Sequence, residues 1–314
     1  MHIPDGMLST PVVAVTGVSS AGFVGYAVSW VRTRLTQQRT VLMAVMAALI
    51  FALQMLNFPV AGGTSGHFAG GAVAAIVLGT WPAVIVMTTV LVVQALLFAD
   101  GGVLALGANI LNMAVIAPLV GSALWMIACT MSRKRGVRVA GAFSAGWAAA
   151  VVAALAAAAE IWLSGNARFG LIMGAMGVWH AVIGIGEGLI TAGLVAYLLA
   201  VRPDLLDSSE GAERSSVTAV IVSLGVLGVA AAGLSFLASA KPDALEFVTS
   251  GQGAGGAGAA ERLLRSPLPD YLLPGVNNHT IAGVLAGIVG LVVTGALVWM
   301  GISSLRHRRP DSPS

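Results

Sequence analysis

The sequence predicts an all-α polytopic membrane protein, in which a seven-helix bundle is followed by two C-terminal transmembrane helices. Of the 314 residues, 57% are hydrophobic and only 9% are charged, whereas soluble domains carry about 25% charged residues. The mean hydropathy is +0.92, and apolar runs recur from near the N-terminus to residue 305. Runs of this length and composition are typical of membrane-spanning helices.

Nine apolar segments are predicted to cross or enter the membrane. The third and fourth are short and are separated only by Trp81 and Pro82. Because a helix needs about 20 residues to cross the hydrocarbon core, the third is expected to be tilted or partly re-entrant. The segments are residues 10–31, 40–60, 67–80, 82–99, 104–131, 139–162, 171–201, 216–240 and 280–305.

The chain divides into two blocks. Residues 1–201 hold the first seven segments, and residues 202–215, "RPDLLDSSEGAERS", form a polar linker. Residues 216–314 hold two helices that flank a long loop, 241–279. The loop contains "GQGAGGAGAA", which is low in complexity, and "SPLPDYLLPG", in which prolines oppose helix formation.

The basic residues predict the orientation in the membrane. If the N-terminus is outside, twelve of the 16 Lys and Arg fall on the inner side, in the loops 32–39 and 133–138, the linker and the C-terminus. Inner loops of membrane proteins are enriched in Lys and Arg. The expected topology is therefore N-terminus outside and C-terminus inside. The net charge of +3 reflects this placement rather than a nucleic-acid surface.

A stripe of small residues lies on the first segment. Gly17, Ala21 and Gly25 are spaced by four residues, so they share one helix face that suits close helix packing. Packing inside the protein is the favoured interpretation, and a contact with a partner protein is the alternative.

The chain begins "MHIPDGMLST", and these residues predict a metal chelate. No basic region and short apolar stretch suggest a signal peptide. The large His2 disfavours removal of the initiator, so we expect the mature chain to keep Met1. The α-amine, the His2 amide nitrogen and the His2 imidazole could then bind one metal in fused rings. Ni(II) and Cu(II) favour such planar nitrogen sites, and the lone Cys129 offers no thiolate site.

A fourth ligand is expected from another histidine on the same side of the membrane. His67 lies in "NFPVAGGTSGHFAGG", the outer loop after the second segment, whose glycines allow a tight inward fold. His307 is predicted inside, His180 lies within the seventh segment, and His279 lies in the late outer loop. His67 is therefore the preferred fourth ligand on topology.

Further polar residues are candidates for support of this site. Asp5 could orient His2, or cap the first helix, which is the favoured interpretation. His180 and Glu187 share one face of the seventh segment and could form a proton or cation path, although pairing with neighbouring polar groups is favoured. Amide side chains can bond between helices. The amide candidates are Gln94, Asn109 and Asn112.

Four stretches of residues 1–201 resemble one known family. "MHIPDGMLS", "GGTSGHFAGG", "QALLFADGGVLALGANILNM" and "WHAVIGIGEGLITA" look like the membrane-embedded M component (CbiM/NikM) of energy-coupling-factor (ECF) cobalt and nickel transporters. The resemblance implies a substrate-binding bundle that holds the metal with the Met1 amine, His2 and His67. "KPDALEFV" and "SPLPDYLLPG" resemble the small N component of the PDGLE type, with Ala244 in place of the usual glycine.

The resemblance also implies how such a subunit works. It would bind Ni(II) or Co(II) as transported ions, with no permanent cofactor, in the cytoplasmic membrane of a prokaryote. It would need a transmembrane coupling (T/Q) protein and a cytoplasmic ATPase pair in the lipid bilayer. The sequence has no GxxxxGK[ST] phosphate loop, which agrees with a transport subunit rather than an enzyme. The residues do not decide between nickel and cobalt.

Two other functions remain open from the residues. A stand-alone divalent cation channel or secondary transporter would need a continuous polar path, to which only His180 and Glu187 point. A membrane metalloenzyme could hold zinc with His67, His180 and Glu187, but the chain contains no HExxH pattern. Blocking the α-amine should abolish function only if the N-terminal chelate is correct.

Overall fold

The computed structural model describes residues 1–34, 36–60, 64–206, 241–251 and 266–307, with 222, 225–228, 230, 231 and 233. Residues 207–215 of the predicted linker and 252–265 of the predicted loop lie outside these ranges, as do Gly62 and Gly63. Within the predicted eighth segment, 216–240, the few positions described are helical.

The described chain is almost entirely helical. Its helices are α1 (Thr10–Arg32), α2 (Gln37–Gln54), α3 (Gly71–Leu78), α4 (Thr80–Val93), α5 (Leu106–Asn109), α6 (Ala117–Met131), α7 (Arg135–Leu163), α8 (Phe169–Val201), α10 (Ala244–Gly251) and α11 (His279–His307). Two π-helical turns, η2 (Gln94–Phe98) and η3 (Ile110–Ile116), extend α4 and join α5 to α6. Short 3-10 turns cover Pro203–Leu205 and Pro269–Tyr271. β1 (Asn57–Pro59) and β2 (Ser65–His67) form an antiparallel hairpin.

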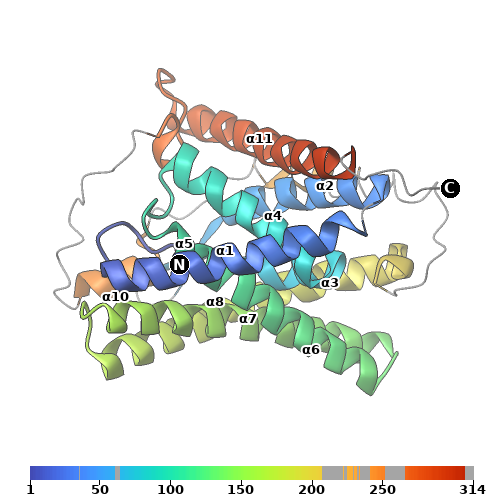
Figure 1. The fold of residues 1–314 in the computed structure, drawn as a ribbon, viewed down its shortest axis with the longest axis horizontal. Coiled ribbons are helices and arrows are strands. Elements are labelled where there is room, and N and C mark those ends of the chain that lie inside the picture. The colour runs from blue at the N-terminus through green and yellow to red at the C-terminus, as the bar shows by residue number, and fades with distance from the viewer. Residues whose placement is uncertain are drawn as a thin grey trace.

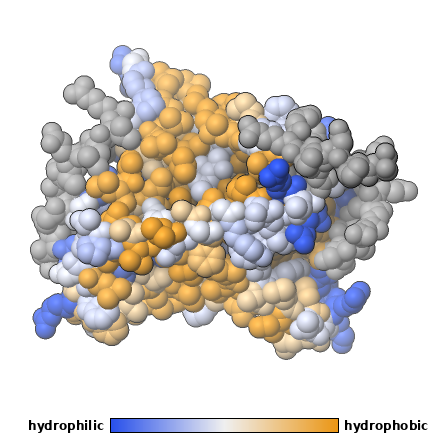
Figure 2. Space-filling model, viewed as in Figure 1, coloured by the Kyte–Doolittle hydropathy of each residue, from blue (hydrophilic) through white to orange (hydrophobic). Residues whose placement is uncertain are grey.

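Seven helices of the described residues are long and apolar enough to cross a membrane. They run roughly along the long axis of the molecule (Figure 1). Apolar side chains cover the middle of one face, and the most hydrophilic residues gather toward its two ends (Figure 2). The prediction of an all-α multi-pass membrane protein is confirmed. The seven are Thr10–Arg32, Gln37–Gln54, Thr80–Phe98, Leu106–Met131, Arg135–Leu163, Phe169–Val201 and His279–Leu305.

The third predicted segment is shorter than expected. Only the 8 residues of α3 are helical, a length of about 12 Å that cannot cross a hydrocarbon core of about 30 Å. Gly70 and Gly79 bracket α3 with φ of 82° and 88°, a backbone conformation that a helix cannot continue through. Residues 71–77 are all buried, so α3 is a half-helix enclosed by protein, as a re-entrant segment must be.

The second predicted segment also ends early. α2 stops at Gln54, and β1 (57–59) pairs with β2 (65–67) where a helix was predicted to run to residue 60. Pro59 lies in β1 and disfavours helical geometry before it. The hairpin pairs Asn57 with His67, and this pairing sets where His67 lies.

Small side chains allow the helices around α3 to approach closely. α7 buries a row of alanines against α6 and α8, among them Ala145, Ala149 and Ala153. A Cβ atom on Gly121 of α6 would lie 2.6 Å from Ala72 Cα, so α3 and α6 touch backbone to backbone. Interfaces of small residues are usual between membrane helices.

The C-terminal helix packs on the first block. α11 lies along α2, at the top of the view, and also contacts α4 (Figure 1). Leu268, in the described segment before α11, reaches η2, where its N–H donates to the carbonyl of Leu97 at 2.9 Å. α10 contacts α8. The two predicted blocks are therefore in direct contact.

The stripe on α1 packs inside the described part of the chain at Gly17, where a Cβ atom on Gly107 of α5 would lie 2.6 Å from Gly17 Cα. The favoured interpretation, internal packing, therefore holds for Gly17 and not for the rest of the stripe. Ala21 and Gly25 are exposed, and Gly17 is half-buried. A Cβ atom added to Gly17 or Gly25 would meet nothing within 4 Å. Only 17% of the most apolar stretch of α1 is buried, because α1 lies on the outside of the bundle and packs with one face on α4, α5 and η3.

Candidate metal centre

The N-terminal residues run into the bundle and are anchored there by Asn109. Met1 and Ile3 are buried, with exposed fractions of 5% and 0%. Asn109 of α5 accepts the Ile3 N–H through Oδ1 at 2.8 Å and donates through Nδ2 to the Ile3 carbonyl at 3.1 Å. Gly102 N–H also donates to that carbonyl at 2.9 Å. Asn109 therefore fixes the backbone that directly follows His2.

Contrary to the prediction, Asp5 does not cap the first helix but binds the turn that precedes α5. Its carboxylate accepts the backbone N–H groups of Val103, Leu104 and Ala105 at 3.1, 2.8 and 3.3 Å. These residues precede α5, whereas Ser9 is the N-cap of α1. Asp5 thus ties the N-terminal stretch to the α5 turn.

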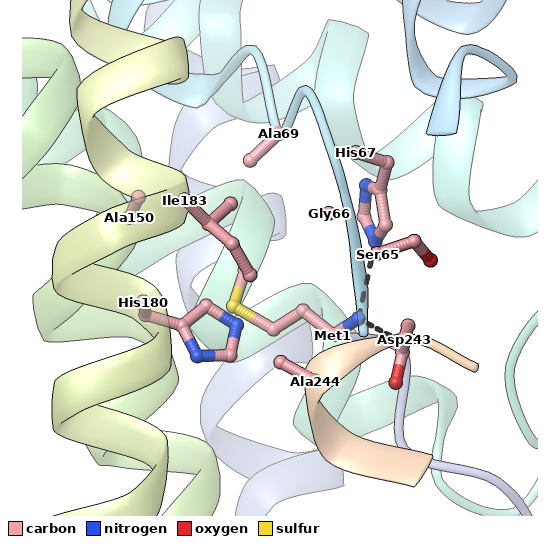
Figure 3. Close-up of a pocket in the computed structure, with 10 residues that line it drawn as sticks. All are labelled: Met1, Ser65, Gly66, His67, Ala69, Ala150, His180, Ile183, Asp243 and Ala244. Atoms are coloured by element: carbon pink, nitrogen blue, oxygen red, sulfur yellow. Dashed lines mark hydrogen bonds and ion pairs between the residues drawn. The ribbon is translucent and has the colours of Figure 1, made fainter. Parts of the chain in front are cut away.

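The structure brings Met1, His2 and His67 together. The Met1 nitrogen lies 3.1 Å from His67 Nε2. The rings of His2 and His67 stack with centroids 5.2 Å apart and an interplanar angle of 19°. Figure 3 shows His67 on the hairpin beside the Met1 nitrogen. Residues that are 66 positions apart thus place an amine and two imidazoles side by side.

Two acidic residues contact these nitrogens, and the sequence analysis did not assign them to the site. Asp243 Oδ2 pairs with the Met1 ammonium, as Figure 3 shows. Asp100 Oδ1 lies 3.2 Å from His2 Nδ1, and the Tyr271 hydroxyl donates to Asp100 Oδ2 at 2.5 Å. Asp243 belongs to "PDALE" and Asp100 to "ADGG", a sequence that on its own is typical of a turn.

Burial sets the protonation of the two imidazoles. Burial, and then the charge of the N-terminal amine, lower the pKa of His67 to about 3. Burial also lowers the pKa of His2, against the opposing effect of Asp100. Burial alone would raise the pKa of Asp243, but the N-terminal ammonium beside it holds that pKa well below its usual range. The imidazoles are therefore neutral near pH 7, the form that binds metals.

Gln94 reaches the site, and Asn112 does not. Gln94 is the first residue of η2, and its Oε1 lies 3.2 Å from His2 Nε2. π-helical turns are frequent at functional sites. Asn112 lies in η3 and donates through Nδ2 to Glu160 Oε2 of α7 at 2.7 Å, so it links two helices away from the nitrogen cluster.

His180 lies on α8 at the far side of a small pocket next to Met1. Its Nδ1 donates to the Met176 carbonyl at 3.0 Å, if the proton is on Nδ1. The thioether of Met1 points toward its ring (Figure 3). The pocket is lined by Met1, Ser65, Gly66, His67, Ala69, Ala150, His180, Ile183, Asp243 and Ala244.

Glu187, two turns further along α8, binds backbone rather than other ionisable groups. Its carboxylate accepts the N–H groups of Ala69 and Gly70 at 2.7 and 2.9 Å. In the described ranges, no three His, Cys, Asp or Glu side chains come together as metal ligands. The zinc set His67, His180 and Glu187 is therefore not assembled among these residues.

The fold is that of a multi-pass helical membrane protein, and nitrogen donors gathered at a buried N-terminus suit a transition metal. Residues 2–205 match the family model of CbiM, the cobalt uptake substrate-specific transmembrane region. Residues 216–307 match the PDGLE domain. The chain belongs to the CbiM family, carries a PDGLE domain after it, and is a membrane component of the metal-transport class. The resemblance found in the sequence motifs is confirmed.

Several relatives align over most of the chain. A protein of Archaeoglobus fulgidus named putative fused nickel transport protein NikMN is 38% identical over 98% of this chain and 99% of its own length. The fused nickel transport protein NikMN of Rhodobacter capsulatus is 34% identical over 98% of this chain and 99% of its own length. The cobalt transport protein CbiM of Sorangium cellulosum is 33% identical over 66% of this chain and 95% of its own.

A solved structure has the same fold in the first block. The crystal structure of a truncated transition metal transporter is 36% identical and superposes with a TM-score of 0.59. The match covers 64% of this chain and 99% of that one.

Proposed function

We propose that this chain is the substrate-binding membrane component of an ECF-type importer for Ni(II) or Co(II). The metal would be held by the Met1 amine, the His2 amide nitrogen, and the imidazoles of His2 and His67. The observation that carries the proposal is the 3.1 Å approach of the buried Met1 nitrogen to His67 Nε2, with the His2 ring stacked alongside.

These donors suit a d-block cation that favours nitrogen. The amine and amide must lose protons to bind, whereas the imidazoles are already neutral. Ni(II) and Cu(II) promote planar binding by amide nitrogen, and Zn(II) prefers a tetrahedron. On binding, the metal would replace Asp243 at the amine and Asp100 at His2 Nδ1. Both carboxylates would then lie close to the cation and help to balance its charge.

Nickel is the preferred substrate within this proposal. The relatives that align over the full length are named nickel transport proteins, whereas the cobalt-named relative aligns with the first two-thirds. The general order of divalent affinities also favours nickel over cobalt at nitrogen sites.

The domain division supports a subunit that joins two components. Residues 1–201 would form the metal-binding domain, 202–215 a cytoplasmic linker, and 216–314 the N-type domain with the extracytoplasmic loop 241–279. Asp243 and Tyr271 belong to that loop and contact the Met1 amine and Asp100. The N-type domain would therefore close the metal site from the outer side.

Energy for transport would come from other subunits. A transmembrane coupling protein and a cytoplasmic ATPase pair would complete the importer, and this chain would not hydrolyse ATP itself. The stripe Gly17, Ala21 and Gly25 on α1, which is exposed at Ala21 and Gly25, is the proposed face for the coupling protein. The distribution of Lys and Arg supports an N-terminus outside and a C-terminus inside the cytoplasmic membrane.

Calorimetric titration of the purified chain with Ni(II) and Co(II) tests the proposal. Three variants are compared: one extra residue before Met1, His67→Ala, and His279→Ala as a matched control on an exposed histidine. We expect the first two to weaken binding by more than about tenfold, since even loss of an outer partner of a metal ligand has such an effect. Undiminished binding with the blocked amine would refute the chelate and favour a channel or secondary transporter.

A further inference from the structure

We propose that Glu187 is a positioning residue for metal binding, because it holds the segment after His67 in the place where the imidazole can serve as a ligand. This inference rests on the proposed function. In this role α8, a membrane-spanning helix, fixes the position of the fourth ligand, His67.

The hydrogen bonds of Glu187 carry the inference. The residue is 2% exposed, and its two oxygens accept one backbone N–H each, from Ala69 at 2.7 Å and from Gly70 at 2.9 Å. These donors lie two and three residues after His67, immediately before α3 begins at Gly71. A carboxylate at the N-terminus of a helix is favoured by the helix dipole as well as by the free N–H groups.

The same segment is held from the opposite side. Gln54 of α2 donates through Nε2 to the Ala69 carbonyl at 2.5 Å. Both polar groups of the Ala69 residue are thus bound by buried side chains of different helices. Ala69 itself has an exposed fraction of 5%, so no solvent competes for these bonds.

α8 also supports the strand before His67. A Cβ atom on Gly66 would lie 2.7 Å from Ile183 Cγ1, so the hairpin touches α8 one turn before Glu187. His67 is therefore flanked by two fixed points on one helix face, a steric contact at Gly66 and a carboxylate clamp at Ala69 and Gly70. Its backbone has little freedom between them, and its Nε2 is aimed at the Met1 nitrogen.

A purely structural carboxylate in the same protein provides the matched control. Glu160 of α7 is also buried, with 7% exposed, and it accepts a hydrogen bond from Asn112. This hydrogen bond joins Glu160 to η3, and it does not involve the hairpin or α3. Glu160→Gln should therefore change stability without changing the site, whereas Glu187→Gln should change the site.

The expected effect of Glu187→Gln is a loss of Ni(II) affinity of about 10- to 100-fold, the range seen when a partner that orients a metal ligand is removed. Glutamine offers one acceptor oxygen and places an NH₂ group against one of the two N–H donors. Glu160→Gln should stay within about twofold of the parent. Calorimetry gives the affinity, and the visible absorption of planar Ni(II) reports the ligand set.

Added imidazole separates positioning from general damage. If Glu187→Gln only misplaces His67, free imidazole should take the fourth position and restore both the planar spectrum and tight binding, as it should in His67→Ala. If the variant is destabilised but His67 keeps its position, free imidazole should not restore Ni(II) binding, and this result would count against a positioning role. Glu187→Asp, which keeps the charge and withdraws the carboxylate by one methylene, should show the same rescue with a smaller loss.

The outcomes are separable. Weak binding with imidazole rescue in both Glu187 variants supports the proposal. Parental affinity in either folded variant, while His67→Ala binds weakly, overturns the role of Glu187 alone. Parental affinity in His67→Ala overturns the proposed metal site itself. If neither Glu187 variant yields folded protein on size-exclusion chromatography while Glu160→Gln does, Glu187 is structural and the positioning role is rejected.

Discussion

At the scale of single residues, the nitrogen donors of the candidate centre are held by carboxylates from distant parts of the chain. Asp243 pairs with an amine 242 residues away, and Asp100 with His2 Nδ1. A charged amine buried without a counter-ion is costly, so Asp243 allows the N-terminus to enter the bundle. The same contact means that a metal must compete with a carboxylate for the amine.

The first prediction concerns this pair. Asp243→Asn should lower the free energy of unfolding by about 1–2 kcal/mol, because one partner of a buried pair is lost while an acceptor oxygen remains. Saturating Ni(II) should reduce the difference in unfolding free energy between Asp243→Asn and the parent, since the metal displaces Asp243 from the amine in the parent. Thermal unfolding in detergent with and without Ni(II) measures both, and Glu246→Gln at the neighbouring exposed carboxylate is the control.

The pH dependence of this difference has a definite sign. The pKa of Asp243 is depressed by the ammonium beside it, so the pair contributes fully above the ordinary Asp pKa of about 4. The contribution is lost as pH falls from there through the depressed value. The unfolding free energies of the parent and of Asp243→Asn should therefore converge below about pH 4. A difference between them that stays constant with pH would contradict the ion pair.

Sequence alone predicts some of these residues and not others. Met1, His2 and His67 carry a chemical pattern, an amine next to an imidazole and a histidine in an outer glycine-rich loop, that does not need coordinates. Asp100 and Asp243 carry no such pattern, because a carboxylate in a turn looks the same whether or not a distant amine folds against it. Their roles arise only from long-range packing.

At the scale of elements, hydropathy predicts which segments enter the membrane but not how they end. Residues 67–80 are apolar apart from the terminal His67 and Thr80, yet they contain the end of a hairpin, a glycine turn and the half-helix α3. The left-handed conformation of Gly70 (φ 82°) and Gly79 (φ 88°) sets those limits. In a chain with 40 glycines, no local signal marks which of them will adopt it.

The second prediction tests the start of α3. Gly70→Ala should destabilise the protein by about 1–3 kcal/mol, because alanine is strained at this φ and its Cβ would lie 2.8 Å from Ile50 Cγ2. Gly174→Ala on α8, where a Cβ meets nothing within 4 Å, should be neutral or stabilising. Chemical or thermal unfolding compares the two, and equal stability would show that the turn is not under this constraint.

At the scale of the whole molecule, the two blocks meet at the candidate centre. α11 packs on α2 and α4. The ring of Tyr271 stacks on Phe98 at the end of η2, with centroids 4.7 Å apart. The second block thus packs directly on the surface of the first. α1 lies on the outside of the bundle. Its stripe touches α5 at Gly17 and is exposed at Ala21 and Gly25, which is where another subunit can pack.

The third prediction concerns that face. Ala21→Leu should leave Ni(II) affinity and thermal stability at parental values, because Ala21 is exposed and lies away from the candidate metal ligands. If the coupling protein packs closely on the stripe, a leucine there should reduce metal uptake by cells several-fold, since close helix contacts exclude large side chains.

Ala123→Leu is the matched control, an exposed alanine on α6 that lies on a different helix from the stripe. Uptake of Ni(II) by cells that express the whole importer, and co-purification of the coupling protein with each variant, are the measurements. Loss of uptake and of co-purification only in Ala21→Leu assigns the face to the partner. Normal uptake with Ala21→Leu would mean that the stripe faces lipid, and that the coupling protein binds elsewhere on the bundle.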